Sequence, residues 1–94
     1  MNPHILFVID HKVRPDKYTK EQLKQNSADA YALALFDLDV DYVAVNAAAY
    51  FAANAAVCAY ADAAAYVDDI MYWLNQYFKS SGEDRKDYIN ALRV

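Results

Sequence analysis

Aspartates are the residues of this chain whose type and spacing could do chemistry. Asp37, Asp39 and Asp41 alternate with apolar residues, as the first acidic ligands of a calcium loop do. A calcium loop also needs Gly at its sixth position and Glu at its twelfth, where this chain has Tyr42 and Ala48. The spacing therefore does not predict a calcium site, and we expect these three acids to be solvated or to face a partner.

A second group of aspartates lies further along the chain. Asp62 and Asp69 are seven residues apart, which places both on one face of a helix, with Asp68 beside them. Paired carboxylates can transfer protons or bind a cation. No catalytic arrangement with His, Lys or Tyr is evident around them in the sequence. They either keep an apolar helix soluble or bind a basic partner, and the predicted partner-binding residues are Asp37, Asp39, Asp41, Asp62, Asp68 and Asp69.

Other motifs for chemistry are incomplete. His4 and His11 are seven residues apart, without the further His or Cys that a metal site needs. The only glycine is Gly82, so the chain has neither a glycine-rich phosphate loop nor a serine nucleophile elbow. A run of cations could contact phosphate or a second copy, or could simply be solvated: Lys12, Arg14, Lys17, Lys20 and Lys24. We therefore expect no enzymatic activity and no cofactor.

The element that must position these acids is a helical segment covering residues 28–78. The segment contains no Lys, Arg, Gly or Pro. Alternating steps of three and four residues land only on apolar or aromatic side chains, which is the period of a helix facing a partner helix. This seam comprises Ala28, Tyr31, Leu35, Leu38, Tyr42, Val45, Ala49, Ala52, Ala56, Ala59, Ala63, Tyr66, Ile70, Trp73 and Tyr77.

The seam has alanines in its middle and large residues at both ends. Small side chains let two helix backbones approach closely. Because the order of sizes is roughly palindromic about Ala56, an antiparallel copy of the helix would match it, as a two-fold dimer requires. The predicted oligomer interface is Ala49, Ala52, Ala56, Ala59, Ala63, Tyr66, Ile70 and Trp73.

The remaining elements follow from local signals. The apolar run His4–Ile9 predicts a short N-terminal strand, and residues 10–17 predict a polar turn. Thr19 and Gln22 have capping-box spacing, so a helix should begin at about residue 19.

The segment Asp37–Asp41 could be a kink, a turn or a second strand. The predicted fold is mainly α. A long Ala-rich helix runs to about Lys79 and is ended by Gly82. A short last helix follows from Glu83, with Ser81 as its N-cap. The whole would form a helical bundle or an antiparallel coiled-coil-like dimer, and a small β-α-β-α fold is the alternative. An uninterrupted helix over residues 28–78 would be about 75 Å long and would need a partner.

Length and charge set the remaining limits. Ninety-four residues predict a single domain over 1–94, whose thin alanine core would gain from self-association. The net charge is −4, but residues 28–78 carry seven aspartates and no cation. A basic protein partner is therefore expected, and direct binding to nucleic acid is not.

The lone Cys58 and the absence of a secretory signal indicate a reducing compartment. The uncharged stretch Tyr42–Ala61 has two Asn and acidic flanks, so a membrane span is not expected.

Two stretches, Val8–Thr19 and Tyr72–Leu92, flank the middle that is rich in Ala, Tyr and Asp. In layout and composition the chain resembles small accessory proteins of tailed bacteriophages. The resemblance implies a protein that binds and disables a host protein, including restriction or CRISPR machinery, in the cytoplasm of a bacterial host. It supplies no functional residue.

Two functions are therefore expected. The first is an anti-CRISPR-like inhibitor that occludes a basic site on a host protein, either a defence protein or a nucleic-acid enzyme, with tyrosines as anchors and aspartates for steering. The second is a structural protein whose alanine-rich helices only assemble.

Overall fold

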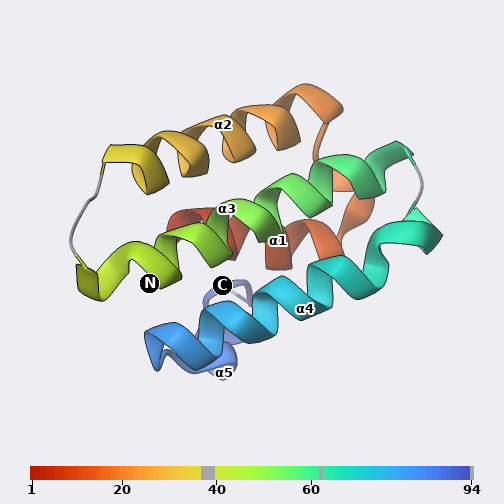
Figure 1. The fold of residues 1–94 in the computed structure, drawn as a ribbon. Helices are drawn as coiled ribbons and strands as arrows, with labels where there is room; N and C mark the ends of the chain where they lie inside the picture. Colours follow the sequence, from red (N-terminus) through yellow and green to blue (C-terminus); the bar gives the residue numbers. More distant parts are fainter. Residues whose placement is uncertain (37–39, 62, 94) are drawn as a thin grey trace.

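Five α-helices and one 3₁₀ turn make up the residues that this computed structural model describes, 1–36, 40–61 and 63–93. The mainly helical class predicted from the sequence is confirmed. Helix α3 lies at the centre, with α1, α2 and α4 packed against it (Figure 1). In chain order the elements are α1 (Pro3–Val13), η1 (Pro15–Lys17), α2 (Lys20–Phe36), α3 (Val40–Ala61), α4 (Ala63–Ser81) and α5 (Arg85–Ala91).

The strand predicted for His4–Ile9 is wrong, because these residues lie in α1. The side chain of Asn2 caps the helix by accepting hydrogen bonds from the backbone N–H groups of His4 and Ile5. Pro3 occupies the first helical position, where its missing N–H costs nothing. The apolar residues also recur at helical spacing, and Ile5, Val8 and Ile9 are buried. No strand occurs in 1–36, 40–61 or 63–93, so the β-α-β-α alternative is wrong as well.

Helix α2 begins where the sequence predicts. Thr19 Oγ1 accepts from the backbone N–H of Gln22, and Gln22 Oε1 accepts from the N–H of Thr19, so the capping box is confirmed. The buried face of α2 is Leu23, Asn26, Ser27 and Ala30. The seam positions Ala28, Tyr31 and Leu35 are instead exposed, so the predicted seam does not run along this helix.

The prediction of one long helix to about Lys79 is also wrong. The described part of residues 28–78 belongs to three helices, α2, α3 and α4, and each packs against the next (Figure 1). The predicted joint at 37–41 lies mostly outside the described residues, and α3 begins at Val40. The physical reason is that one chain supplies its own partner helices. Folding back buries the apolar surface that a single rod would leave to a second copy.

The alanines of α3 let its neighbours approach from several sides. Seven are buried: Ala48, Ala49, Ala52, Ala53, Ala55, Ala56 and Ala59. A helix with such small side chains can be contacted by α1, α2 and α4 at once, because no bulky residue holds any of them away. By length and composition the stretch Tyr42–Tyr60 could also cross a membrane. The core helix of a folded bundle passes the same test.

Helices α4 and α5 complete the core. Helix α4 is amphipathic and buries Ile70, Leu74 and Tyr77. It is followed by Gly82 at φ 73°, the left-handed conformation expected of the helix-ending glycine. Helix α5 is the predicted short last helix, but its N-cap is Asp84, whose carboxylate accepts from the N–H of Lys86. The prediction of Ser81 as that cap is therefore wrong.

Candidate protein-binding surface

Five aromatic side chains form a continuous row across α2, α3 and α4. Tyr31 on α2 lies 5.0 Å from Tyr50 on α3, measured between ring centroids, and Tyr50 lies 5.3 Å from Phe51. Phe51 is stacked on Trp73 of α4 at 4.5 Å. Trp73 in turn meets Tyr72 edge-to-face at 4.9 Å. We call these five residues the aromatic row.

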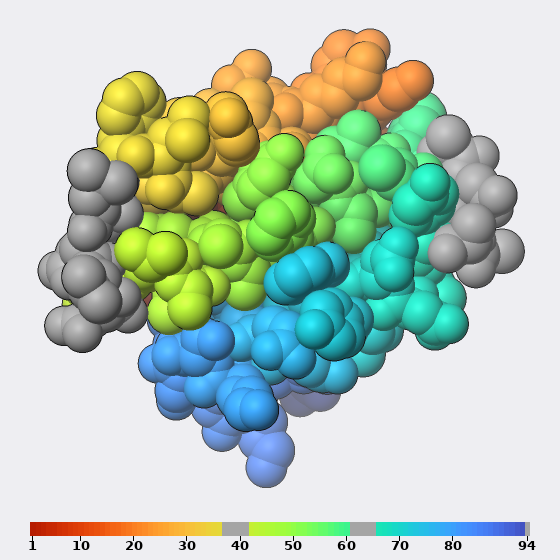
Figure 2. Space-filling model, viewed as in Figure 1, coloured from red at the N-terminus to blue at the C-terminus, as the bar shows by residue number. Residues whose placement is uncertain are grey.

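Much of the aromatic row faces water. The exposed fractions are 47% for Tyr31, 42% for Phe51 and 54% for Tyr72. Tyr50 and Trp73 are half-buried and pack against the core. The three helices that carry the row lie side by side on the face drawn in Figure 2. Contiguous exposed aromatic area of this kind is typical of protein-binding surfaces.

The position of the row follows from the burial of α3. Ala52 and Ala53 turn into the core. The preceding rings lie nearer the surface, where Tyr50 contacts Tyr31 of α2 and Phe51 contacts Trp73 of α4. The seam residue Tyr31 reaches the same surface from α2. Sequence reasoning indicated exposed tyrosines as anchors, but it could not show which rings from separate helices would touch.

Two of the six predicted partner-binding aspartates can be placed at this surface. Asp68 and Asp69 are exposed on α4, one helical turn before Tyr72 and Trp73. Asp37, Asp39 and Asp62 lie outside the described residues. Asp41 is in the first turn of α3, and its side chain is not described. The candidate surface therefore comprises the aromatic row with Asp68 and Asp69.

The residues of the predicted oligomer interface lie mainly inside the chain. Ala49, Ala52, Ala56 and Ala59 are buried in α3, and Ile70 is buried in α4. Tyr66 and Trp73 are half-buried against the same core, and the side chain of Ala63 is not described. The buried alanines contact helices of their own chain, so they do not offer a surface to a second copy in this fold.

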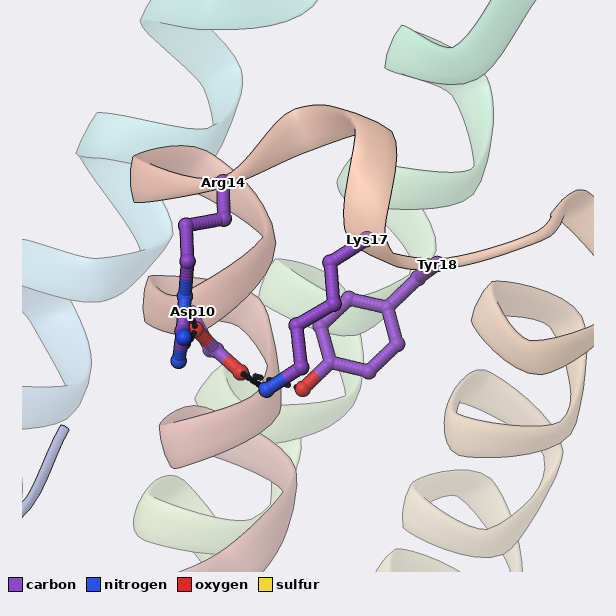
Figure 3. A network of polar contacts seen from close by, with 4 residues as sticks. All are labelled: Asp10, Arg14, Lys17 and Tyr18. Atoms are coloured by element: carbon purple, nitrogen blue, oxygen red, sulfur yellow. Dashed lines mark hydrogen bonds and ion pairs between the residues drawn. The ribbon is translucent and has the colours of Figure 1, made fainter. Parts of the chain in front are cut away.

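A polar network at the end of α1 was not foreseen from the sequence. The carboxylate of Asp10, only 3% exposed, accepts from Arg14 Nε at 2.7 Å, from Lys17 Nζ at 2.8 Å and from the hydroxyl of Tyr18 (Figure 3). Two cations of the predicted basic run are thus paired within the chain. The network attaches η1 to α1, and we assign it to the stability of this corner.

The charge state of this corner follows from its contacts. Burial by itself would raise the pKa of Asp10, but the hydrogen bonds from Lys17, Tyr18 and Arg14 lower it from 3.8 to about 2. Burial lowers the pKa of the adjacent His11, against the opposing effect of Asp10. His11 Nδ1 is buried and has no hydrogen-bond partner among the described residues. The imidazole is therefore neutral at pH 7, and it lines an open cleft of about 600 Å³ beside Ile70.

A second buried network joins the two ends of the described chain. Tyr77 donates to Glu83 Oε1 at 2.8 Å, and the hydroxyl of Tyr88 contacts both Glu83 and Tyr77. The backbone N–H of Asn2 donates to the Tyr88 hydroxyl at 2.8 Å. Burial is the main cause that raises the pKa of both Tyr77 and Tyr88. These phenols remain protonated donors and hold α5 against the start of α1.

Within 1–36, 40–61 and 63–93, no group of three or more His, Cys, Asp or Glu side chains could hold a metal ion. Comparisons with known protein families, with curated proteins and with solved structures found no match. The resemblance to phage accessory proteins therefore stays a prediction, and the surface itself carries any functional proposal.

Proposed function

We propose that this chain acts by binding and that it occludes a basic site on another protein. The observation that carries the proposal is the aromatic row, with Asp68 and Asp69 beside it on α4. Aromatic rings in a rigid helical frame supply affinity at low entropic cost, and exposed carboxylates steer a basic partner towards them.

The charge distribution supports the same role. Residues 28–78 contain no Lys or Arg, so no cation of this segment competes for its aspartates. The basic residues of the chain lie before and after this segment, and Arg14 and Lys17 are held by Asp10. A negatively charged site would repel nucleic acid and attract a protein that binds nucleic acid.

In the setting that the phage resemblance implies, the target would be a host-defence nuclease in the bacterial cytoplasm, and the chain would inhibit without catalysis of its own. Such enzymes hold nucleic acid in basic grooves. A small acidic binder with aromatic anchors would cover part of one groove.

Charge reversal tests the proposal. The immobilised chain is compared with the Asp68→Lys, Asp69→Lys double variant for capture of a basic protein from bacterial lysate, and the captured protein is assayed with and without added chain. We expect the double variant to lose both capture and inhibition. The matched control is Asp16→Lys with Asp87→Lys, which reverses two exposed acids on η1 and α5.

The control should capture as the unmodified chain does. Capture that survives in the Asp68/Asp69 variant would contradict the proposed surface. Recovery of the chain alone would favour the alternative function, a protein that only assembles with itself.

A further inference from the structure

Helix α4 already binds one arginine, which belongs to its own chain. The guanidinium carbon of Arg85 lies 5.1 Å from the centroid of the Phe78 ring, and Arg85 Nη2 donates to Asn75 Oδ1 at 2.7 Å. Asn75 and Phe78 are three residues apart, so the acceptor and the ring lie one turn apart on the same face of the helix. The pair therefore combines a hydrogen-bond acceptor with a flat surface for a guanidinium.

Asp69 and Tyr72 repeat this spacing on another face of α4. They lie six residues before Asn75 and Phe78, which rotates the pair by about 240° around the helix axis. Tyr72 follows Asp68 and Asp69 by four and three residues, which places all three on one side of α4, and long side chains on a helix lean towards the preceding turn. Both aspartates and Tyr72 are exposed. A carboxylate is also a stronger acceptor for a cation than the amide of Asn75.

We propose that Asp69 and Tyr72, assisted by Asp68, form a binding site for an arginine side chain of the protein partner. This inference rests on the proposed function and names the chemistry that the partner must present. Arginine fits better than lysine because its planar guanidinium can stack on the ring and donate two parallel hydrogen bonds to one carboxylate. The lysine ammonium is a compact and strongly hydrated charge that gains less from a ring.

The arginine must come from outside residues 28–78, which contain none. Arg14 is paired with Asp10, and Arg85 is occupied by Asn75 and Phe78. Tyr72 is 54% exposed, so its ring is accessible to an incoming side chain. The edge-to-face contact with Trp73 fixes the ring in place without covering it.

Two synthetic peptides test the assignment. They have equal length and charge and share a Gly/Ser background, and one carries four arginines where the other carries four lysines. Trp73 is the only tryptophan of the chain and lies 4.9 Å from Tyr72, so its fluorescence reports binding at this site. We expect the arginine peptide to change the Trp73 signal and to bind about three- to fivefold more tightly than the lysine peptide.

Single variants separate the two parts of the site. Tyr72→Leu should abolish the preference for arginine, while Asp69→Asn should weaken the binding of both peptides. The matched controls are Tyr60→Leu, which removes a tyrosine of similar exposure (51%) outside the aromatic row, and Asp16→Asn. Both controls should bind like the unmodified chain, and circular dichroism checks that every variant keeps its helix content.

Three results would overturn the inference: equal affinity for the two peptides, an arginine preference that persists in Tyr72→Leu, or the absence of any Trp73 response. If capture of a basic protein is still lost on charge reversal of Asp68 and Asp69, the proposed function stands without the arginine site. Arg93 is the third arginine of the chain and is exposed. Self-association that is lost in Asp69→Asn and also in Arg93→Lys would assign the site to a second copy and overturn the assignment to another protein.

Discussion

Asp10 is a buried carboxylate that three neighbours keep ionised. Arg14 lies one turn further along the chain, while Lys17 and Tyr18 approach from η1 and the residue after it. Because every contact comes from residues close in sequence, the network closes the corner between α1 and α2 without help from the rest of the fold. It is a local stabilising device.

Acid should weaken this corner in a defined pH range. The folded-state pKa of Asp10 is about 2, below its unfolded value of 3.8, so the carboxylate stabilises the fold above about pH 4 and this contribution is lost as pH falls towards 2. We expect a loss on the order of 1–2 kcal/mol, because water and salt screen the half-exposed Arg14 and Lys17.

Urea denaturation at a series of pH values measures this effect. Asp10→Asn should be less stable than the unmodified chain at pH 7 and nearly equal to it at pH 2. Asp16→Asn, which changes an exposed acid in the same corner, should keep the full pH dependence. A constant difference between Asp10→Asn and the unmodified chain from pH 7 to 2 would contradict the assigned role.

At the scale of the element, Gly82 is the residue whose backbone conformation limits substitution. Its φ is 73°, and a Cβ placed there would meet no atom within 4 Å. Gly82→Ala should therefore destabilise by about 1 kcal/mol through backbone strain alone. Gly82→Asn should cost less, because Asn tolerates the left-handed region. Thermal unfolding of both variants checks the order, and equal melting temperatures for Ala and Asn would contradict it.

Ala52 tests how closely the neighbouring helices approach α3. It is fully buried in that helix. Ala52→Leu should destabilise the fold by roughly 1–3 kcal/mol, because the added atoms must push a neighbouring helix away. Ala44→Leu, at an exposed position of the same helix, should change stability little. Urea midpoints measure both, and an equally stable Ala52→Leu would show that the centre of the bundle is loosely packed.

Two local signals in the sequence predicted helix boundaries correctly, whereas the Ser81 cap and the periodic signals did not. The Thr19 capping box and Gly82 are correct because each depends on a few adjacent residues. The continuous apolar run at His4–Ile9 is compatible with a strand as well as with a helix, and the signal that decides for a helix is Asn2–Pro3, an N-cap followed by proline at the first helical position.

The long helix predicted from the alanine seam is wrong for a different reason. Thirteen of the 23 residues in 44–66 are Ala, so almost any helical register appears apolar there. The pattern could not distinguish an intramolecular partner helix from a second copy. The aromatic row depends on contacts between three helices, and a one-dimensional pattern does not contain that information.

The molecule as a whole should be compact in solution. The Cα radius of gyration is 12.4 Å. A straight helix of about 75 Å would instead have a radius of gyration of about 22 Å. Small-angle scattering at low concentration should give a value near the compact one, slightly raised by side chains and hydration. A value near 20 Å would restore the long-helix interpretation.

The order in which the helices pack has a consequence for folding speed. The contacts of α3 are chiefly with its sequence neighbours α2 and α4, so most of the core closes through short loops. Proteins with such low contact order fold in microseconds to milliseconds. Docking of α1 onto α3 and α5 spans longer separations and should follow. In temperature-jump relaxation, Ile5→Val should leave the refolding rate nearly unchanged and speed unfolding, whereas Leu74→Ala should slow refolding.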